Sequence, residues 1–345
     1  MRRAVVLGGT GAIGWAVTRR LRLADWDVTV TARQSGPVPT GLPATGAHFV
    51  VSGRHEPDAL RAVLAAGADL VVDCSCFTAD HAAALAPLLA DVTSAVMISS
   101  KAVYVDGHGR HSNSREAPEF LRPVDESNPT LRPNGEDFNS PAGYGPNKVA
   151  AEETLLATGA NVTVLRPSKV HGAWSRQPRE WHFVKRVLDR RPAILLARGG
   201  AGADHPTAAQ NLAALVQLVA ENPAPRVLNI ADPDCPDGRR IAGVIAAHMD
   251  HSWREVLLDE AAPPGLGAHP WNRVPPFELD TTAAERLGYV PNGDYAATVS
   301  DEVDWLVAGS AAPEVERSFD SLVRRYAPSP EDYALEDAYL GERPG

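Results

Sequence analysis

The sequence of 345 residues predicts an α/β fold with a doubly wound parallel sheet, and three observations lead to that fold class. Short aliphatic runs alternate with helical runs through the first half of the chain, which is the pattern of a parallel sheet with helical crossovers. A glycine cluster, "GGTGAIG", separates the first aliphatic run from the first helical run. The composition, 44% hydrophobic and 22% charged, is that of an ordinary globular protein with a sizeable core.

The strands and helices of this sheet follow one another at short intervals. Each predicted strand is a short aliphatic run, typical of a sheet that is buried on both faces, and these strands cover 4–7, 28–32, 48–52, 69–75, 94–100 and 162–168. The apolar periodicity between them predicts helices over 13–23, 58–66, 80–90 and 146–157. One later aliphatic run, 226–231, is expected to return to the same sheet.

The remaining chain is less regular. Residues 105–142 form a polar loop rich in Pro, Asn and Gly. Helical patterns recur at 180–190, 208–221, 239–249 and 296–308, and the basic face of the first favours a packed helix that lines a pocket. We therefore expect a first domain over 1–170 with the returning strand, a smaller, loop-rich C-terminal domain over 171–310, and an acidic, partly disordered tail over 311–345.

The net charge and the cysteines exclude several classes of protein. A formal charge of −10 and a pI near 5.6, with no local run of Lys or Arg, would repel a phosphate backbone, so nucleic acid is not an expected partner. No apolar stretch approaches the roughly 18 residues of a membrane span, and the N-terminal one is too short for a signal peptide. Three cysteines form neither a disulfide framework nor a zinc pattern, so we expect no metal, a cytoplasmic location and a small-molecule partner.

The glycine cluster has the spacing of a dinucleotide-binding turn. Gly8, Gly11 and Gly14 follow a strand and open a helix. Glycines let the backbone approach a pyrophosphate, which the unpaired N–H groups and the positive dipole end of the helix attract. The sequence therefore predicts a dinucleotide at Gly8, Gly11, Ala12, Ile13 and Gly14, with a glycine-rich turn that binds nothing as the alternative.

The end of the second strand indicates which dinucleotide is bound. An acidic side chain there would bind the ribose 2′-hydroxyl of NAD(H), but "VTVTARQ" has Ala32 at that position and Arg33 beside it. A guanidinium holds a 2′-phosphate bidentately, whereas a carboxylate would repel it. We therefore expect NADP(H) in preference to NAD(H). In the alternative interpretation Arg33 is a solvated residue at a strand end, and NAD(H) is then possible.

A tyrosine, a lysine and a serine are candidates for catalysis. In "YGPNK", Tyr144 and Lys148 are four residues apart and share one helical face. A nearby cation lowers the pKa of a phenol and lets it exchange a proton with a carbinol or ketone oxygen near neutral pH. Ser100 stands at the end of a buried strand, where doubly wound sheets place ligands, and its hydroxyl is expected to hold the same oxygen. A chance Tyr-x-x-x-Lys pair and a capping role for Ser100 are the alternatives.

Taken together, "GGTGAIG", "SSKAVY", "YGPNK" and "LRPSKVHG" resemble, in their order, motifs of the short-chain dehydrogenase/reductase superfamily, in particular its extended branch of NAD(P)-dependent epimerases and dehydratases. The resemblance extends more weakly, through "RVLNIAD" and "LDTTAAERLGYVP", to about residue 308. It implies a Rossmann fold, a general acid/base role for Tyr144, ribose binding by Lys148 and a contact of Pro167 with the nicotinamide carboxamide. Ser75 and Cys76, at the end of the fourth strand, are further candidates for contact with a cofactor ribose.

Two departures from the family pattern concern the substrate. His171 replaces the tyrosine of the usual "VYG", and "RGGAGADHPTAAQNL", at 198–212, has Asp204 and His205 but lacks the arginine that commonly clamps a nucleotide diphosphate. These departures weaken the interpretation as a nucleotide-sugar enzyme. The candidate substrate contacts are Lys101, His171, Trp174, Arg176 and His205.

These residues predict an NADP(H)-dependent oxidoreductase that transfers a hydride between nicotinamide C4 and a carbinol or ketone carbon of a small polar or sugar-like substrate. Epimerisation is the second interpretation, and dehydration is the third because Lys101 and Ala102 occupy the positions where a dehydratase has an acid pair. A non-catalytic NADP-binding regulator is a further alternative. A homodimer is the oligomer that the resemblance implies. We interpret the loop at 105–142 as a lid, with an inert surface excursion as the alternative.

Overall fold

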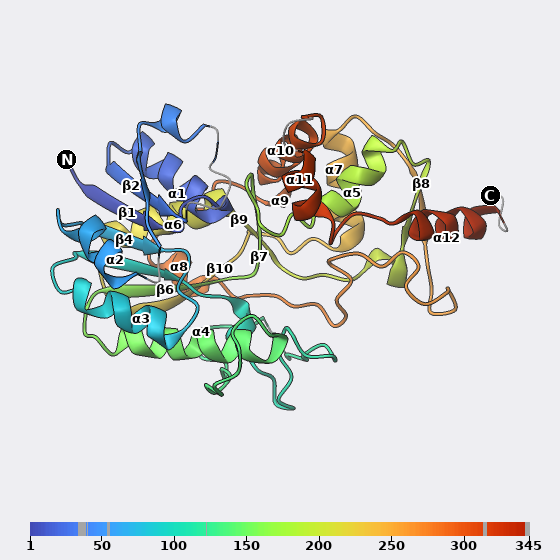
Figure 1. Ribbon diagram of the computed structural model, residues 1–345. Coiled ribbons are helices and arrows are strands. Elements are labelled where there is room, and N and C mark those ends of the chain that lie inside the picture. Colours follow the sequence, from blue (N-terminus) through green and yellow to red (C-terminus); the bar gives the residue numbers. More distant parts are fainter. Residues whose placement is uncertain (34–38, 40, 54–55, 122, 313–315, 342–345) are drawn as a thin grey trace.

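A seven-stranded parallel sheet organises one half of the computed structural model (Figure 1), which describes residues 1–33, 39, 41–53, 56–121, 123–312 and 316–341. In spatial order the strands are β10 (Arg226–Ile230), β6 (Val162–Pro167), β5 (Ser94–Ile98), β4 (Leu70–Asp73), β1 (Arg3–Leu7), β2 (Asp27–Ala32) and β3 (His48–Val51). This is the doubly wound order, with its switch point between β1 and β4, and β10 joins it beside β6. The sheet confirms the predicted fold class and the returning strand.

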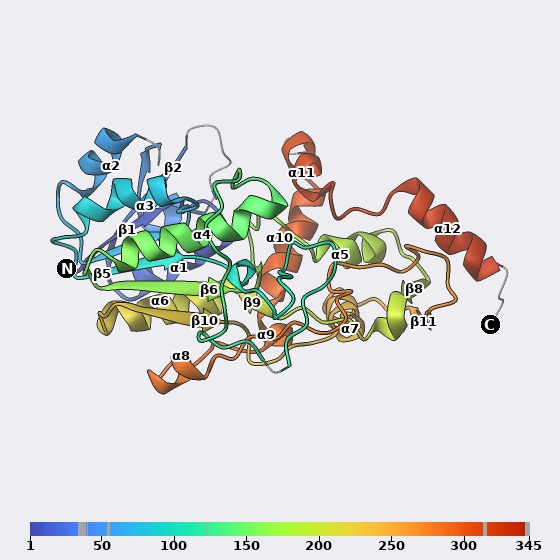
Figure 2. The ribbon, with the colours of Figure 1, turned by 90° about the horizontal axis from the view of Figure 1, so that it is seen from below.

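Helices cover both faces of this sheet (Figure 2). Those on the first face are α1 (Ala12–Leu23) and α6 (Ala209–Glu221), and those on the second are α2 (Pro57–Leu64), α3 (Ala79–Leu85) and α4 (Pro141–Leu156). Successive side chains of β1 alternate between the two apolar layers: Ala4 and Val6 join the first, and Val5 and Leu7 join the second. Burial on both faces therefore requires the unbroken aliphatic runs of the sequence.

A second, smaller region lies at the carboxyl ends of the strands (Figure 1) and has an apolar core of its own that includes Phe183, Ile241 and Trp271. The helices around this core are α5 (Trp181–Leu188), α7 (Gly238–His248), α9 (Tyr295–Thr298), α10 (Ser300–Ser310) and α11 (Glu316–Val323). Two short parallel pairs complete the region, β8 (Ala193–Leu196) with β11 (Arg254–Leu257) and β7 (Lys169–His171) with β9 (Pro206–Ala208). The sequence does not predict these strands, because three or four residues carry too little periodicity.

The helix with the candidate catalytic residues begins earlier than the sequence predicts. α4 starts at Pro141 and not at residue 146. Ser140 caps it, because its Oγ atom accepts a hydrogen bond from Gly143 N over 2.9 Å, and proline is favoured at the first helical position. The signal for the helix start, "SPAG", thus lies inside a stretch that composition alone marks as loop.

The remaining elements are short. They are η1 (Pro43–Thr45), η2 (Ala86–Leu88), η3 (Lys101–Val103), η4 (Ala197–Gly200) and α8 (Thr282–Arg286). η2 takes up part of the helix predicted over 80–90, and α9 and α10 divide the helix predicted over 296–308. None of the helices in the described ranges has both the length and the apolar composition needed to cross a membrane.

The acidic C-terminal segment forms two helices over residues 316–341, which differs from the expected partial disorder. α11 places Phe319 and Val323 in the core of the second region, and α12 (Pro330–Gly341) follows at the far end of the molecule (Figure 2). Glu336 of α12 is buried and accepts hydrogen bonds from Arg186 Nη2 over 2.6 Å and from Arg191 Nη2 over 3.4 Å. Acidic composition predicts solvation, but this carboxylate has specific partners in the fold.

Candidate active site

The turn between β1 and α1 is built from glycines, each for its own physical reason. Gly8 has a φ of +77°, a conformation that glycine adopts without strain, and the N–H groups of Gly8 and Gly9 both donate to Thr31 O over 3.0 Å. A Cβ atom on Gly14 would lie 2.3 Å from Gly9 Cα, so the start of α1 packs this closely only as glycine. A Cβ atom on Gly11 would meet no atom within 4 Å. The backbone is therefore open to a ligand at Gly11.

The amino end of α1 carries the polarity that an anion requires. Gly11 has no side chain with which to cap the helix, and the first turn contains no acidic residue. The first N–H groups of a helix have no partner within it, and the helix dipole is positive at this end. Gly11, Ala12 and Ile13 line a large cavity. The turn is thus fitted to a pyrophosphate.

Two arginines stand at the edge of the glycine turn. Arg33 follows β2 and is exposed. Arg176 comes from the segment after β7, and its Nη2 atom lies 3.4 Å from Thr10 Oγ1. Burial and, after it, the nearby positive charge of Arg33 lower the pKa of Arg176. The two guanidinium groups therefore act on each other at the place where an adenosine ribose of a dinucleotide is expected.

Tyr144 and Lys148 lie one helical turn apart on α4 and line the same cavity. Tyr144 is half-buried, whereas Lys148 is only 2% exposed. Lys148 Nζ donates to Cys76 O over 2.7 Å and to Ile98 O over 2.9 Å, and it lies 4.4 Å from the centre of the Phe77 ring. An ammonium has three N–H groups. Two of them therefore fix its position on the backbone of the sheet edge.

The segment after β5 lies directly against α4. Ser100 begins η3, its Oγ atom accepts a hydrogen bond from Ala102 N over 3.2 Å, and it lines the cavity. A Cβ atom on Gly145 would lie 2.5 Å from Ala102 O. The glycine of "YGPNK" thus permits the close approach of helix and turn that brings Ser100 and Tyr144 to one cavity.

A buried polar network supports this edge from behind. Ser99 Oγ donates to Glu152, and Arg166 Nη2 donates to Glu152 Oε2 over 2.6 Å. Arg166 Nη1 also donates to Tyr104 OH over 3.2 Å, and Tyr104 OH donates to Asn229 Oδ1 over 2.7 Å. Burial raises the pKa of Tyr104 to about 12. Tyr104 of "SSKAVY" is therefore a buried structural residue, whereas Tyr144 lines the cavity.

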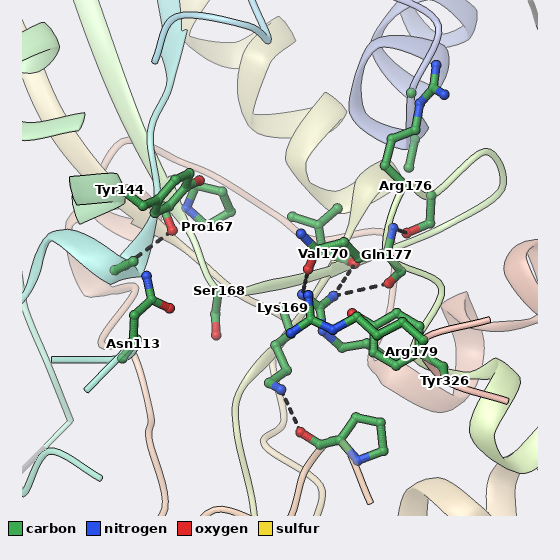
Figure 3. Close-up of a pocket in the computed structure, with 18 of the residues that line it drawn as sticks. Asn113, Tyr144, Pro167, Ser168, Lys169, Val170, Arg176, Gln177, Arg179 and Tyr326 are labelled. Carbon is green, nitrogen blue, oxygen red and sulfur yellow. Dashed lines mark hydrogen bonds between the residues drawn. The ribbon is translucent and has the colours of Figure 1, made fainter. Parts of the chain in front are cut away.

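The cavity has a volume of about 1650 Å³ (Figure 3). An ordinary ligand pocket has roughly 300–1,000 Å³, so this one has room for a dinucleotide and a second ligand. Of the residues that the sequence predicts for the site, those that line it are Gly8, Gly11, Ala12, Ile13, Gly14, Arg33, Ser75, Ser100, Lys101, Tyr144, Lys148, Pro167 and Arg176. Figure 3 shows Tyr144 and Pro167 in one part of the cavity and Lys169 and Arg179 in another.

Charged side chains line the half of the cavity away from the glycine turn. The buried Asp204 carboxylate contacts Lys101 Nζ directly, and it lies 3.3 Å from Lys169 Nζ and 3.4 Å from Arg273 Nε. Burial and the charge of Lys169 lower the pKa of Lys101 well below its usual value. Burial and the charge of Arg179 act in the same way on the pKa of Lys169. The Asp204 carboxylate is thus shared by three basic side chains.

Four predicted site residues lie outside the lining of this cavity: Cys76, His171, Trp174 and His205. His171 Nε2 lies 2.8 Å from Asp232 Oδ2, and His205 Nε2 lies 2.8 Å from Asp232 O. Burial lowers the pKa of His205, as expected for a neutral imidazole inside the protein. Trp174 packs on Trp305, with 5.7 Å between the ring centres. Sequence position beside the family motif therefore did not decide which side chains face the cavity.

The structure adds basic residues to the site that the sequence does not predict: Lys169, Arg179, Arg186, Arg273 and Arg325. Lys169 follows "LRPS" directly, so its proximity to Pro167 is a signal that the sequence contains. Arg186 lies on the predicted basic helix. Arg273 lies in a proline-rich stretch without periodicity, and only the tertiary fold brings it to Asp204.

The loop at 105–142 contributes two segments to the cavity lining, 112–114 and 138–141. Asp106 fixes the first part of this loop: its carboxylate accepts hydrogen bonds from the backbone N–H groups of His108, Arg110 and Glu119 over 2.8–2.9 Å. Burial alone would raise the pKa of Asp106, but these hydrogen bonds and one from the Arg110 side chain outweigh it and lower the pKa to about 2. The ionised carboxylate therefore joins residues 106–119 of the loop to one another.

The sheet order and the position of the cavity at the strand ends define a dinucleotide-binding, doubly wound protein. Comparison with known proteins specifies the family. The family model described as "NAD dependent epimerase/dehydratase family" matches residues 4–231, and the chain belongs to this family. The family name describes NAD-dependent enzymes, and the membership agrees with the resemblance that the motifs carry.

Individual relatives are similar over different shares of the chain. A 2'-dehydrokanamycin reductase from Streptomyces kanamyceticus is 34% identical over 162 residues, which are 47% of this chain and 40% of that protein. The solved structure of a dTDP-glucose 4,6-dehydratase from Bacillus anthracis in complex with NAD has a TM-score of 0.66 at 14% identity and covers 90% of this chain and 98% of that one. A UDP-glucose 4-epimerase from Thermotoga maritima with UDP-glucose has a TM-score of 0.66 at 16% identity, covering 89% and 99%. These two structures establish a shared fold.

Proposed function

We propose that the chain is an NADP(H)-dependent oxidoreductase that interconverts a carbinol and a ketone on a small polar or sugar-like substrate. The observation that carries this proposal is that Tyr144, Lys148 and Ser100 line the same cavity as the glycine turn. Proton-transfer groups and a pyrophosphate-binding turn thus face one space, which has volume for both ligands.

The residues around the glycine turn would hold the cofactor. The N–H groups at the start of α1 bind the pyrophosphate, Ser75 lies at the end of β4 beside the turn, and Pro167 stands at the end of β6 for the nicotinamide carboxamide. When bound, the cofactor supplies or accepts a hydride at nicotinamide C4. Lys148, fixed by Cys76 O and Ile98 O, has one N–H group left for a ribose hydroxyl.

Tyr144 is the proposed general acid/base. In reduction its hydroxyl gives a proton to the substrate oxygen, and in oxidation the phenolate takes that proton. Lys148 lies one turn along α4 from Tyr144. Ser100 Oγ donates a hydrogen bond to the same substrate oxygen and orients it. Donors that meet developing charge on an oxygen typically account for about 10²–10³-fold in turnover each.

The preference for NADP(H) rests on Arg33 and Arg176. Both line the cavity at the glycine turn, they lie close enough to interact electrostatically, and Ala32 occupies the position where NAD(H)-binding members have an acid. A 2′-phosphate would neutralise two guanidinium groups that otherwise oppose each other.

Dissociation constants of NADPH and NADH, measured by fluorescence, test this preference. Arg33→Ala should weaken NADPH about tenfold to a hundredfold, the cost of a lost charge-assisted hydrogen bond, and leave NADH unchanged. Arg61→Ala is the matched control, because Arg61 is an exposed arginine on α2 that pairs with Asp58. Tighter binding of NADH than of NADPH by the unmodified chain would reject the proposal.

The substrate half of the cavity favours a ligand with a negative group or many hydroxyls. Lys169, Arg179, Arg273 and Arg325 line it, and Asp204 is already shared among three cations. A carboxylate or phosphate on the substrate would complete the pairing of these side chains. Inorganic phosphate and simple carboxylates should therefore inhibit in competition with the substrate.

Epimerisation is the second candidate, because a solved UDP-glucose 4-epimerase shares the fold over 89% of the chain. A reductase consumes the cofactor in proportion to product, whereas an epimerase returns the hydride to its substrate. Mass spectrometry of the cofactor that co-purifies, followed by a screen of ketones and sugars for loss of NADPH absorbance, distinguishes the two. Dehydration ranks third, because Lys101 is paired with Asp204 where a dehydratase would have an acid pair.

The loop at 105–142 is a proposed lid over the substrate. Asn113 lines the cavity from this loop (Figure 3), whereas Arg115 is exposed and does not line it. Asn113→Ala should change KM or substrate preference with the cofactor affinity unchanged, and Arg115→Ala should change neither. Identical kinetics for both variants would favour an inert surface excursion.

A further inference from the structure

Three buried side chains meet where the second region joins the sheet. His171 ends β7, Glu180 immediately precedes α5, and Glu302 lies on α10. They are 1%, 2% and 0% exposed. One ligand atom of each, the imidazole nitrogen or a carboxylate oxygen, lies within 4.8 Å of the other two. We refer to these residues as the His171–Glu180–Glu302 cluster.

Each member of the cluster has a buried polar atom without a hydrogen-bond partner: His171 Nδ1, Glu180 Oε2 and Glu302 Oε1. Their other polar atoms are engaged. Gly172 N donates to Glu302 Oε2 over 2.5 Å, and Tyr295 OH lies 3.4 Å from Glu180 Oε1. Buried polar atoms are nearly always satisfied in proteins, so three unsatisfied atoms in one place require an explanation.

The partner of His171 fixes which ring nitrogen carries the proton. Asp232 Oδ1 accepts hydrogen bonds from Ala208 N over 2.7 Å and from Asn211 Nδ2 over 2.8 Å, and Asp232 Oδ2 lies 2.8 Å from His171 Nε2. A carboxylate held by two such donors is an acceptor, so His171 Nε2–H donates to it. Nδ1 is thus the ring nitrogen that has no hydrogen-bond partner and that can serve as a ligand atom. A carboxylate behind a histidine is the usual arrangement around a metal-binding imidazole.

The two glutamates of the cluster have few partners of their own. Glu180 and Glu302 are buried carboxyl groups beside the His171 imidazole, and Asp232 pairs with the other side of that ring. Arg179 is a nearby guanidinium that interacts with Glu302, but its hydrogen bonds go to Val170 O and to Gln177. A bound cation would satisfy the three free atoms together.

We propose that the His171–Glu180–Glu302 cluster binds one divalent metal ion, with Zn²⁺ as the preferred ion. One nitrogen and two carboxylate oxygens, completed by water, form a donor set that zinc accepts in four-coordinate sites. Ligands 2.0–2.2 Å from one ion in a tetrahedral site lie roughly 3.3–3.6 Å apart. The ligand atoms of the cluster lie within 4.8 Å of one another, so they would close up around the ion when it binds.

The ion would have a structural role. No member of the cluster lines the cavity that contains Tyr144 and Lys148. The ion would instead join the end of β7, the start of α5 and the middle of α10, and so fix the second region on the sheet. The spacing of the cysteines does not predict a metal site. His171, Glu180 and Glu302 are too far apart in the sequence to form a recognisable ligand motif, so only the fold indicates this site.

The metal content of the full-length protein tests the proposal. After growth with added ZnSO₄ and desalting, plasma mass spectrometry should find close to one zinc per chain, and less than a tenth of that in Glu302→Gln and in Glu180→Gln. Glu336→Gln is the matched control, because Glu336 is an equally buried glutamate that pairs with Arg186 outside the cluster. This variant should keep the zinc.

Two further measurements cover variants that do not fold. Removal of the metal from the unmodified chain with a chelator should lower Tm by several degrees, and ZnSO₄ should restore it. Replacement with Co²⁺ should give the visible absorption of a four-coordinate site. Absence of zinc and of a cobalt spectrum in the unmodified chain, or zinc retained in both folded cluster variants, would overturn the proposal. The first result would leave a carboxyl pair that shares a proton.

Discussion

The two halves of the cavity are built by different means. Around the glycine turn, the absence of side chains at Gly8, Gly11 and Gly14 shapes the cavity and the close packing behind it. In the other half, the long side chains of Lys101 and Lys169 surround the buried Asp204. The shape of the first half thus depends on the path of the backbone, whereas the shape and charge of the second half depend on individual side chains.

This difference teaches which half of such an enzyme can be identified without coordinates. A backbone site needs a fixed local order of strand, glycines and helix, so it leaves a continuous motif. A side-chain site can be assembled from any positions that the fold brings together. The following experiments separate the two halves, beginning with the largest expected effect.

The strongest disruption is expected at Asp204 in the side-chain half. Asp204→Asn leaves Lys101, Lys169 and Arg273 without their shared counter-charge, so the free energy of unfolding should fall by about 3–5 kcal/mol. Denaturant titration measures this loss. Asp301→Asn, which breaks the exposed pair with Arg19, should cost less than about 1 kcal/mol. Equal losses in both variants would contradict the importance assigned to burial.

The next effect is on turnover and involves Tyr144. Tyr144→Phe removes the proton donor but keeps the ring, so kcat should fall by at least about 10²–10³-fold, while the dissociation constant of NADPH should not change. Stopped-flow or steady-state assays with a substrate from the screen measure kcat, and fluorescence measures the binding. Undiminished turnover would remove Tyr144 from the chemistry.

In the backbone half, two glycines should give opposite phenotypes. Gly14→Ala places a Cβ atom 2.3 Å from Gly9 Cα, so it should lower the free energy of unfolding by about 1–3 kcal/mol. In Gly11→Ala the new Cβ atom would meet no protein atom within 4 Å, so the free energy of unfolding should not change. The same atom should weaken the binding of NADPH. Thermal unfolding and NADPH titration of both variants check this. A stable Gly11→Ala protein with full cofactor affinity would show that the pyrophosphate does not approach there.

The smallest effect is confined to acid. Because the pKa of Asp106 is lowered to about 2, its stabilisation of the loop is complete above the ordinary carboxyl pKa of about 4 and is lost as the pH falls toward 2. Hydrogen exchange of residues 106–119 should therefore accelerate in that interval. In Asp106→Asn the same amides should exchange rapidly already at neutral pH. Acid-independent exchange in the unmodified loop would disprove the anchoring role.

The sequence predicts the sheet well because its central strands are buried on both faces. A run such as "AVVL" is recognisable without knowledge of its neighbours, since both faces demand apolar side chains. The edge strand β3 is exposed at all four positions, yet its aliphatic residues still predict it. The returning strand β10 is predicted for the same reason as the central ones.

The second region is predicted less completely because its contacts are long-range. Arg273 pairs with Asp204, and Glu336 pairs with Arg186. The partners in each pair lie far apart in the sequence, and the local sequence around one residue does not indicate the other. His171 and His205 were expected near substrate from their positions beside a motif, but both imidazoles turn to Asp232. The position of a residue beside a motif predicts where its backbone lies, whereas the packing around it determines the direction of its side chain.

The last helix has a consequence for how the enzyme's selectivity can be changed. α12 contributes Glu336 to the cavity wall, where its carboxylate accepts a hydrogen bond from Arg186 Nη2 over 2.6 Å. The helix α12 thus forms part of the wall of the cavity half that is proposed for the substrate, and a buried ion pair holds it there. Exchanging this one segment between homologues offers a route to new ligand preferences that leaves the nucleotide machinery intact.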